Sequence, residues 1–155
     1  MWGDNSSGQC NVPEPNNGFT AIAAGLTHSL GLKSDGSIVA WGDNTYGQLN
    51  VPEPNSGFVA IAAGKWHSLG LKSDNSIVAW GDNSYGQCNV PSPNSGFTAI
   101  AAGGYSSLAI RECLYNVAGD YNDDCRVDME DFAVFADGWL VDCYATPSNP
   151  ACVPK

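Results

Sequence analysis

Oxygen-bearing side chains cluster near the C-terminal end of this 155-residue chain. Counting from Asp120 as position one, they fall at positions one, three, five, nine and twelve, and Arg126 at position seven contributes a backbone carbonyl. The candidate ligands are Asp120, Asn122, Asp124, Arg126, Asp128 and Asp131. This is the spacing of a twelve-residue loop that binds Ca²⁺. The sequence therefore predicts calcium as a cofactor, and the alternative is an acidic, solvated start of a helix.

Apolar side chains recur at helical spacing directly after this loop and predict a helix of about three turns. They are Met129, Phe132, Phe135, Ala136, Trp139 and Leu140. A calcium loop followed by a helix, with Asp131 at position twelve, resembles one half of a dockerin module with an EF-hand-like loop. Cys125 replaces the usual turn glycine, and the remaining VDCYATPSNPACVPK has no second loop. The resemblance therefore implies calcium binding more than cohesin binding.

Four cysteines crowd into the same tail: Cys113, Cys125, Cys143 and Cys152. They favour disulfides and an oxidising compartment, hence an extracellular or cell-surface location, because the CxxC-like pairs of a zinc site are missing from the sequence. Four cysteines allow three pairings. A bond from Cys125 to Cys143 is disfavoured, because the predicted helix would separate them by about 18 Å. We favour Cys113 with Cys125 and Cys143 with Cys152.

Composition narrows the class of protein. The net charge is −10, which argues against a nucleic-acid partner, and the sequence has no apolar run long enough for membrane insertion. Charged residues make up only 14% of the chain, whereas it holds 18 glycines and 9 prolines. Such a chain suits short strands joined by tight turns better than helices.

WGDN recurs at Trp2, Trp41 and Trp80, which gives a period of 39 residues. The copies 2–40 and 41–79 differ at eight positions, and a third copy, 80–110, is incomplete. Each full copy predicts three short strands, which in the first copy are Phe19–Gly25, His28–Lys33 and Ser37–Gly42. The turn at Gly36 tolerates positive φ, as does Asn75 in the second copy. VPEPN forms an extended connector.

The motifs AAG-x-x-HSL-x-LKSDG and AWGDN-x-x-GQ, repeated over residues 2–110, resemble the regulator-of-chromosome-condensation repeat family. The resemblance is strongest to its bacterial short-repeat branch, which includes a propeller-type beta-lactamase inhibitor protein. It implies a β-propeller. We predict a mainly β fold with a partial β-propeller of about three short antiparallel blades over residues 1–110. Residues 111–155 would form a small cysteine-rich module with the calcium loop and helix.

Residues that recur at one repeat slot have a structural interpretation. His28 and His67 are expected to hydrogen-bond within their own blades, because Ser106 replaces them in the third copy. Trp41 and Trp80 are expected to pack within the blades. Cys10 and Cys88 stand where the second copy has a leucine, so we expect them to be small buried hydrophobes.

Variable positions between constant strands are the candidate partner-binding residues. One slot lies between the first two strands of each copy, and the other lies in the WGDN-x-x-GQ turn. The candidates are Leu26, Thr27, Lys65, Trp66, Gly104, Tyr105, Tyr46 and Tyr85. A constant scaffold with changing loops is typical of a recognition surface, and Trp and Tyr dominate interface energetics. The alternative is drift at exposed positions.

Three function classes follow from these features. We predict a non-catalytic extracellular module that binds a protein through propeller loops. The alternative is a structural or anchoring piece of a larger secreted protein, linked to polysaccharide degradation by its dockerin-like tail. An enzyme is disfavoured, because the sequence has no nucleophile–base pair and no phosphate loop. The family's rings have about seven blades, so we expect either a C-terminal fragment or several copies that complete a ring together.

Overall fold

The computed structural model describes residues 1–111 of the chain. The chain divides into two units, Met1–Glu112 and Cys113–Lys155. The predicted calcium loop, the helix after it and the four candidate disulfide cysteines lie outside the described residues. Within residues 1–111, no helix is long and apolar enough to cross a membrane.

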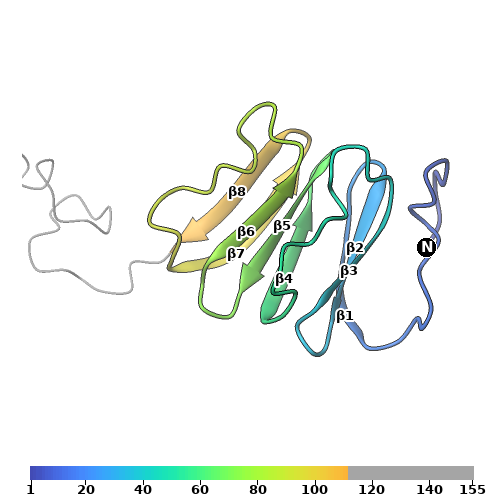
Figure 1. The fold of residues 1–155 in the computed structure, drawn as a ribbon, viewed down its shortest axis with the longest axis horizontal. Coiled ribbons are helices and arrows are strands. Elements are labelled where there is room, and N and C mark those ends of the chain that lie inside the picture. The colour runs from blue at the N-terminus through green and yellow to red at the C-terminus, as the bar shows by residue number, and fades with distance from the viewer. Residues whose placement is uncertain (112–155) are drawn as a thin grey trace, which may run out of the picture. The chain divides into compact units, whose positions relative to one another are not determined.

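Within residues 1–111, eight strands form three antiparallel sheets, as the repeat predicts (Figure 1). The strands are β1 (Phe19–Ala24), β2 (His28–Lys33), β3 (Ile38–Gly42), β4 (Phe58–Ala63), β5 (His67–Lys72), β6 (Ile77–Gly81), β7 (Phe97–Gly103) and β8 (Ser106–Arg111). The first two sheets have three strands each, and the third, in the described part of the chain, has only β7 and β8. The first and third strands are each one residue shorter than expected in the first copy, ending at Ala24 and starting at Ile38.

The hairpin between the second and third strands of each full copy depends on one left-handed residue. Gly36 has φ 77° and Asn75 has φ 65°, which confirms the expectation for both positions. Asp35 supports the first of these turns by accepting hydrogen bonds from the backbone N–H and the hydroxyl of Ser37. Such side-chain bonds favour the turn over a continued strand.

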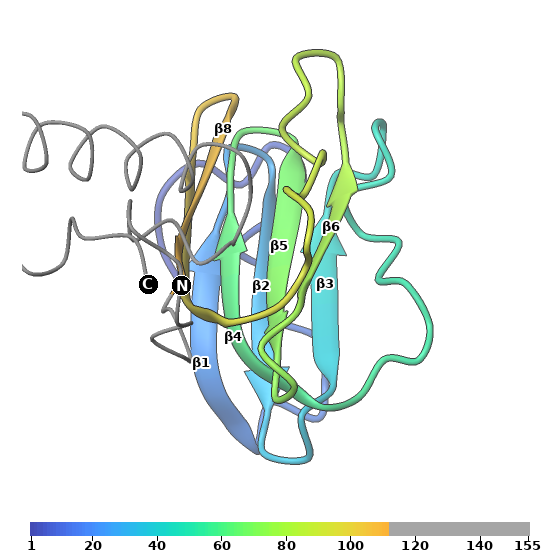
Figure 2. The same cartoon turned by 90° about the vertical axis from the view of Figure 1, so that its left-hand side faces the viewer.

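The sheets stack face to face (Figure 2). β4 packs against β1 and β2 of the first sheet, and β7 packs in the same way against β4 and β5 of the second. Leu30, Leu32 and Ile38 of the first sheet pack with residues of the second, of which Phe58 and Trp80 are buried. Leu71 and Ile77 of the second sheet pack in the same way against Phe97 of the third. Burial of each large apolar side chain contributes about 1.5–3 kcal/mol, so these two interfaces hold the stack together. This architecture is part of a β-propeller.

A buried hydrogen-bond network crosses from each sheet to the next. His28 Nε2 lies 3.0 Å from Ser68 Oγ, and that hydroxyl donates to the Gln48 carbonyl at 3.0 Å. Trp80 Nε1 donates to the same carbonyl at 2.9 Å. Because the serine hydrogen is already donated, His28 must be the donor, and its neutral form carries the proton on Nε2.

The two histidines therefore have a structural role, but they bond across sheets and not within their own blades as expected. The contact joins His28 to Ser68 and His67 to Ser107, which are 40 residues apart in each case. Cys10 and Cys88 also differ from the expectation. They are half-buried, and each thiol donates to a backbone carbonyl at 3.3 Å, that of Asp4 or Asp82.

Candidate functional site

Four variable aromatic side chains meet on the loops at one end of the sheets. Tyr46 and Trp66 stack with ring centroids 4.7 Å apart. Trp66 meets Tyr105 edge-on at 5.6 Å, and Tyr105 lies 5.0 Å from Tyr85. We call Tyr46, Trp66, Tyr105 and Tyr85 the aromatic row. It spans loops attached to all three sheets, so residues far apart in sequence form one continuous surface.

Much of the aromatic row faces solvent. Tyr46 is 45% exposed, Tyr85 is 75% exposed and Tyr105 is 38% exposed, while Trp66 is half-buried between its neighbours. Large aromatic side chains at such exposure provide contact area at low conformational cost, since their packing against one another already limits their rotation.

Lys65 supplies the cation of this surface. Its Nζ lies 4.1 Å from the centre of the Trp66 ring and 4.8 Å from that of Tyr105. The ammonium also donates to the Tyr105 hydroxyl at 2.7 Å, and the Lys65 backbone N–H donates to the Gly104 carbonyl at 2.8 Å. These contacts fasten the loop of the second sheet to that of the third and fix the edge-on arrangement of the two rings.

Buried glutamines set the positions of the two exposed tyrosines. The Tyr46 backbone N–H donates to Gln48 Oε1 at 2.8 Å, and Gln48 Nε2 donates to Asp43 at 3.0 Å. Gln48 is fully buried, so this bond anchors an exposed ring to the rigid interior. The third copy repeats the arrangement with Tyr85 N–H on Gln87 Oε1 at 2.9 Å.

Two aspartates tie these tyrosine turns to the neighbouring loops. The Asp82 backbone N–H donates to the Trp66 carbonyl at 2.9 Å, and that of Asp43 donates to the Thr27 carbonyl at 2.9 Å. Hydrogen bonds lower the pKa of Asp82, and the largest contribution comes from the Ser84 hydroxyl. The Thr45 hydroxyl lowers the pKa of Asp43 in the same way. Both carboxylates are therefore ionised at neutral pH and hold their turns as acceptors.

The first copy contributes less to this surface. Thr27 occupies the slot of Trp66 and lies 3.5 Å from an oxygen of Asp43. Leu26, which is 55% exposed, borders a shallow hollow of about 380 Å³ together with Lys65 and Gly104. The structure thus brings every candidate partner-binding residue to the same end of the sheets, and the aromatic row begins at the second copy.

Sequence reasoning missed the glutamines. Gln9, Gln48 and Gln87 occupy the same slot in all three copies, and each is buried. A polar residue that recurs two positions after a variable residue was the available signal. It identifies a side chain whose hydrogen bonds support the variable loop.

The buried contact between His28 and Ser68 is not arranged as a catalytic pair. Ser68 and His28 are fully or almost fully buried, so no substrate reaches them. The Ser68 hydroxyl also donates to a carbonyl and has no proton directed at the imidazole. Within residues 1–111, no group of three or more histidine, cysteine or acidic side chains is placed to hold a metal ion.

Comparisons with known proteins agree with this architecture. Residues 19–48 and 58–87 match the family model "Regulator of chromosome condensation (RCC1) repeat". A search of the curated proteins found no match.

Several solved structures share the fold. The structure of Prp20p from Saccharomyces cerevisiae, described with its binding properties to Gsp1p and histones, is 26% identical with a TM-score of 0.54 and covers 61% of this chain and 28% of that chain. The CRINKLY WD40 ectodomain of the Arabidopsis thaliana receptor kinase ACR4 is 31% identical with a TM-score of 0.58, covering 70% of this chain and 38% of that one. The ectodomain of the Physcomitrella patens receptor kinase CR4 is 28% identical with a TM-score of 0.52, and the match covers 61% of this chain and 26% of that chain.

This chain therefore spans less than two fifths of each of these solved structures. The matched segments begin at the first strands of the first two sheets, at Phe19 and Phe58, and end at Gln48 and Gln87, after the turns that hold Tyr46 and Tyr85. Both complete repeats of the chain thus match the RCC1 repeat, and residues 1–111 fold as part of a β-propeller.

Proposed function

We propose that this protein is a non-catalytic binding module that recognises a protein partner through the aromatic row and Lys65. The observation that carries the proposal is the continuous contact of four variable aromatic rings, three of them exposed, on a scaffold that is otherwise repeated. Interfaces are enriched in Trp and Tyr, and a few such residues carry most of the binding energy.

The physical character of the surface favours a protein over the other classes of partner. The row is open and spans three sheets, whereas small-molecule sites are concave. Nucleic acid is disfavoured, because the net charge is −10 and Lys65 is the one cation that contacts the rings of the row in the described part of the chain.

The solved relatives give the proposal a precedent. RCC1-type propeller repeats commonly mediate protein binding, and the Prp20p structure is described with binding to Gsp1p and histones. Those partners belong to Prp20p. What we carry over is the use of a propeller as a protein-binding scaffold, on which the loops decide the partner.

Affinity capture with the full chain tests the proposal. The bait proteins are the wild type, Trp66→Ala, Tyr105→Ala and, as a matched control, Val59→Ala, an exposed apolar residue outside the row. We expect a protein that the wild type and the control retain and that both row variants lose. Equal retention by all four baits would contradict the proposal.

We also propose that the tail binds calcium and that the protein works outside the cell or at its surface. The support is the spacing of Asp120, Asn122, Asp124, Asp128 and Asp131 and the cysteine content of the tail. An anchoring role of the tail in a larger secreted protein is the alternative to a purely stabilising one.

Calorimetric titration of the oxidised full chain with calcium, then with magnesium, tests the metal site. A calcium ion bound only by the folded form would stabilise it by about 2.7 kcal/mol at a hundredfold excess over Kd. Asp120→Ala should abolish the heat and the rise in melting temperature. If calcium produced neither heat nor a rise in melting temperature in the wild type, the segment would be an acidic start of a helix and not a calcium site.

A further inference from the structure

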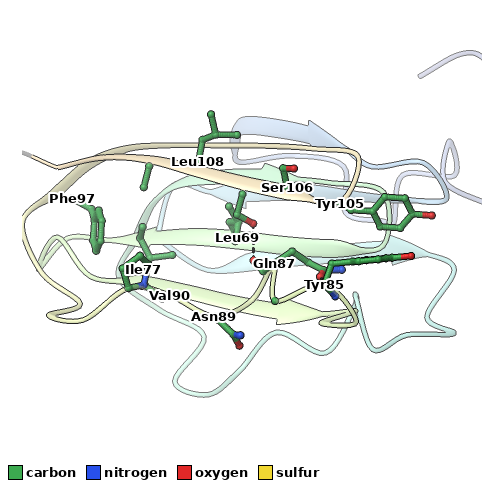
Figure 3. A pocket seen from close by; sticks show the side chains of 14 residues that line it. Leu69, Ile77, Tyr85, Gln87, Asn89, Val90, Phe97, Tyr105, Ser106 and Leu108 are labelled. Atoms are coloured by element: carbon green, nitrogen blue, oxygen red, sulfur yellow. Dashed lines mark hydrogen bonds between the residues drawn. The ribbon is translucent and has the colours of Figure 1, made fainter.

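A cavity of about 380 Å³ lies beside β8, at the edge that no other strand of residues 1–111 pairs with. Figure 3 shows Phe97 and Ile77 at one end of the cavity, Tyr85 and Tyr105 at the other, and Leu69 and Gln87 between them. The cavity is large enough for a buried aromatic side chain and falls within the size range of ligand pockets, about 300–1,000 Å³.

The lining of this cavity repeats a tryptophan site that occurs inside the chain. One repeat earlier, Trp80 packs against Leu30, Ile38 and Phe58, with its ring 6.5 Å from that of Phe58. A shift of 39 residues converts Leu30, Ile38, Gln48 and Phe58 into Leu69, Ile77, Gln87 and Phe97, and all of these shifted residues line the cavity. The cavity is thus built to accept an indole.

The Gln87 carbonyl has the matching open acceptor position. In the two complete sheets, the equivalent carbonyls each accept a serine hydroxyl and an indole N–H, as Gln48 does from Ser68 and Trp80. Gln87 accepts the hydroxyl of Ser107 at 2.7 Å, and within residues 1–111 no indole reaches it. A carbonyl oxygen accepts two hydrogen bonds, so one position is available.

The outer face of the third sheet is apolar and exposed. Leu108 and Ile110 are 61% and 63% exposed. Their counterparts Leu69 and Leu71 in the second sheet are 2% and 4% exposed, because the next sheet covers them. This face is therefore one half of the sheet-to-sheet interface that the chain forms twice.

The other half of that interface lies at the opposite end of the stack. Trp2, the first WGDN tryptophan, is 95% exposed. Ile22 of the first sheet is 72% exposed, whereas its counterpart Ile61 is half-buried against the neighbouring sheet. Trp2 and Ile22 are thus the exposed counterparts, one repeat earlier, of Trp41 and Ile61. Ile61 packs at the contact between the first and second sheets.

We propose that the third sheet binds the first sheet of a second copy of this chain, with Trp2 of that copy in the cavity. The register of the second sheet, in which Ser68 lies opposite Trp80, places Trp2 opposite Ser107 and its Nε1–H toward the Gln87 carbonyl. The Ile22 face then covers Leu108 and Ile110. Ser106 stands in the histidine slot, so the indole and the apolar face carry this contact.

The two surfaces differ, so the contact is head-to-tail and joins copies into a ring or an open chain. Sedimentation equilibrium of the full chain and two variants tests it. Trp2→Ala removes the indole and keeps the cavity, while Leu108→Asp spoils the acceptor face and keeps the indole. Both residues are exposed, so both variants should fold, and circular dichroism verifies this.

We expect the wild type to associate at micromolar concentration and each variant alone to associate at least about tenfold more weakly. An equimolar mixture of the two variants should form a one-to-one dimer, because each supplies the surface that the other lacks. A wild type that stays monomeric up to about 100 µM would overturn the proposal. Undiminished association of either variant would also overturn it, as would a monomer destabilised by Leu108→Asp, since the Leu108 side chain would then already be buried within the monomer.

Discussion

The buried residues of the stack are the same in the two full copies, whereas residues on its loop surface differ, although both belong to one repeat. The two full copies differ at Ser6/Thr45, Ser7/Tyr46, Cys10/Leu49, Asn17/Ser56, Thr20/Val59, Leu26/Lys65, Thr27/Trp66 and Gly36/Asn75. None of these residues is buried in either copy. The buried residues stay the same because each sheet must fit the next, whereas loop positions and the exposed strand position Thr20/Val59 are free to change.

Three of the second-copy residues that differ lie close together in space. Tyr46, Lys65 and Trp66 are all substitutions relative to the first copy, and they contact one another or share Tyr105. Independent drift at exposed positions gives no reason for the new residues to meet. The second and third copies therefore carry an aromatic surface that the first copy lacks.

The largest expected difference between the interior and the loop surface is in stability, and it can be measured on two tryptophans of the same blade. Trp80→Ala should lower the free energy of unfolding by about 3–5 kcal/mol, because it leaves a cavity in the core and removes one of the two hydrogen bonds to the Gln48 carbonyl. Trp66→Ala on the rim should cost about 1 kcal/mol, the scale of an aromatic pair. Urea denaturation measures the loss of unfolding free energy in both variants. Equal losses would show that Trp66 packs as tightly as the interior residue Trp80.

The interior should also respond to acid through its histidines. Burial lowers the pKa of His28 to about 4, and a second proton would sit on Nδ1, which has no partner among the described residues. As pH falls below about 6.5, His28 becomes protonated in the unfolded chain but stays neutral in the folded chain. The free energy of unfolding therefore decreases until about pH 4, where the folded chain is protonated as well. His28 alone accounts for up to about 3 kcal/mol.

His67 adds to this effect in the same direction, since burial lowers its pKa as well. Denaturation at pH 7 and at pH 4.5 measures the slope, and His28→Gln should flatten it. An unchanged slope in that variant would assign the acid sensitivity to other groups.

A smaller effect is expected at the differing position in the hairpin turn between the second and third strands. Asn75→Gly should be nearly neutral, because Gly36 fills the same left-handed position in the first copy. Asn75→Ala should cost about 1 kcal/mol, since alanine lacks the side chain that makes this conformation tolerable. Thermal unfolding checks both, and a costless alanine would show that the turn is not under conformational control.

Much of the fold could be predicted because its determinants are local. The 39-residue period, the alternation in HSLGLK and the Gly36 or Asn75 turn specify the strands and hairpins one copy at a time. The pairing of His28 with Ser68 could not be predicted in this way. It depends on how one sheet stacks on the next, which no single copy encodes.

The candidate site shows the same division. The variable slots that hold Lys65, Trp66 and Tyr105 were evident in the sequence as loop positions. Their stacking, and the support of Tyr46 by Gln48, arise from the spacing between sheets and a bond into the interior. Sequence reasoning identified the residues of the surface, and the structure supplied their contacts.

Titration calorimetry with the captured partner tests whether the aromatic row binds a protein. Trp66→Ala and Tyr105→Ala should each weaken binding by about 2 kcal/mol or more, a Kd roughly 30-fold higher, while Val59→Ala leaves it unchanged. A Kd within about threefold of the wild type for both row variants, with the chain still folded, would contradict the account.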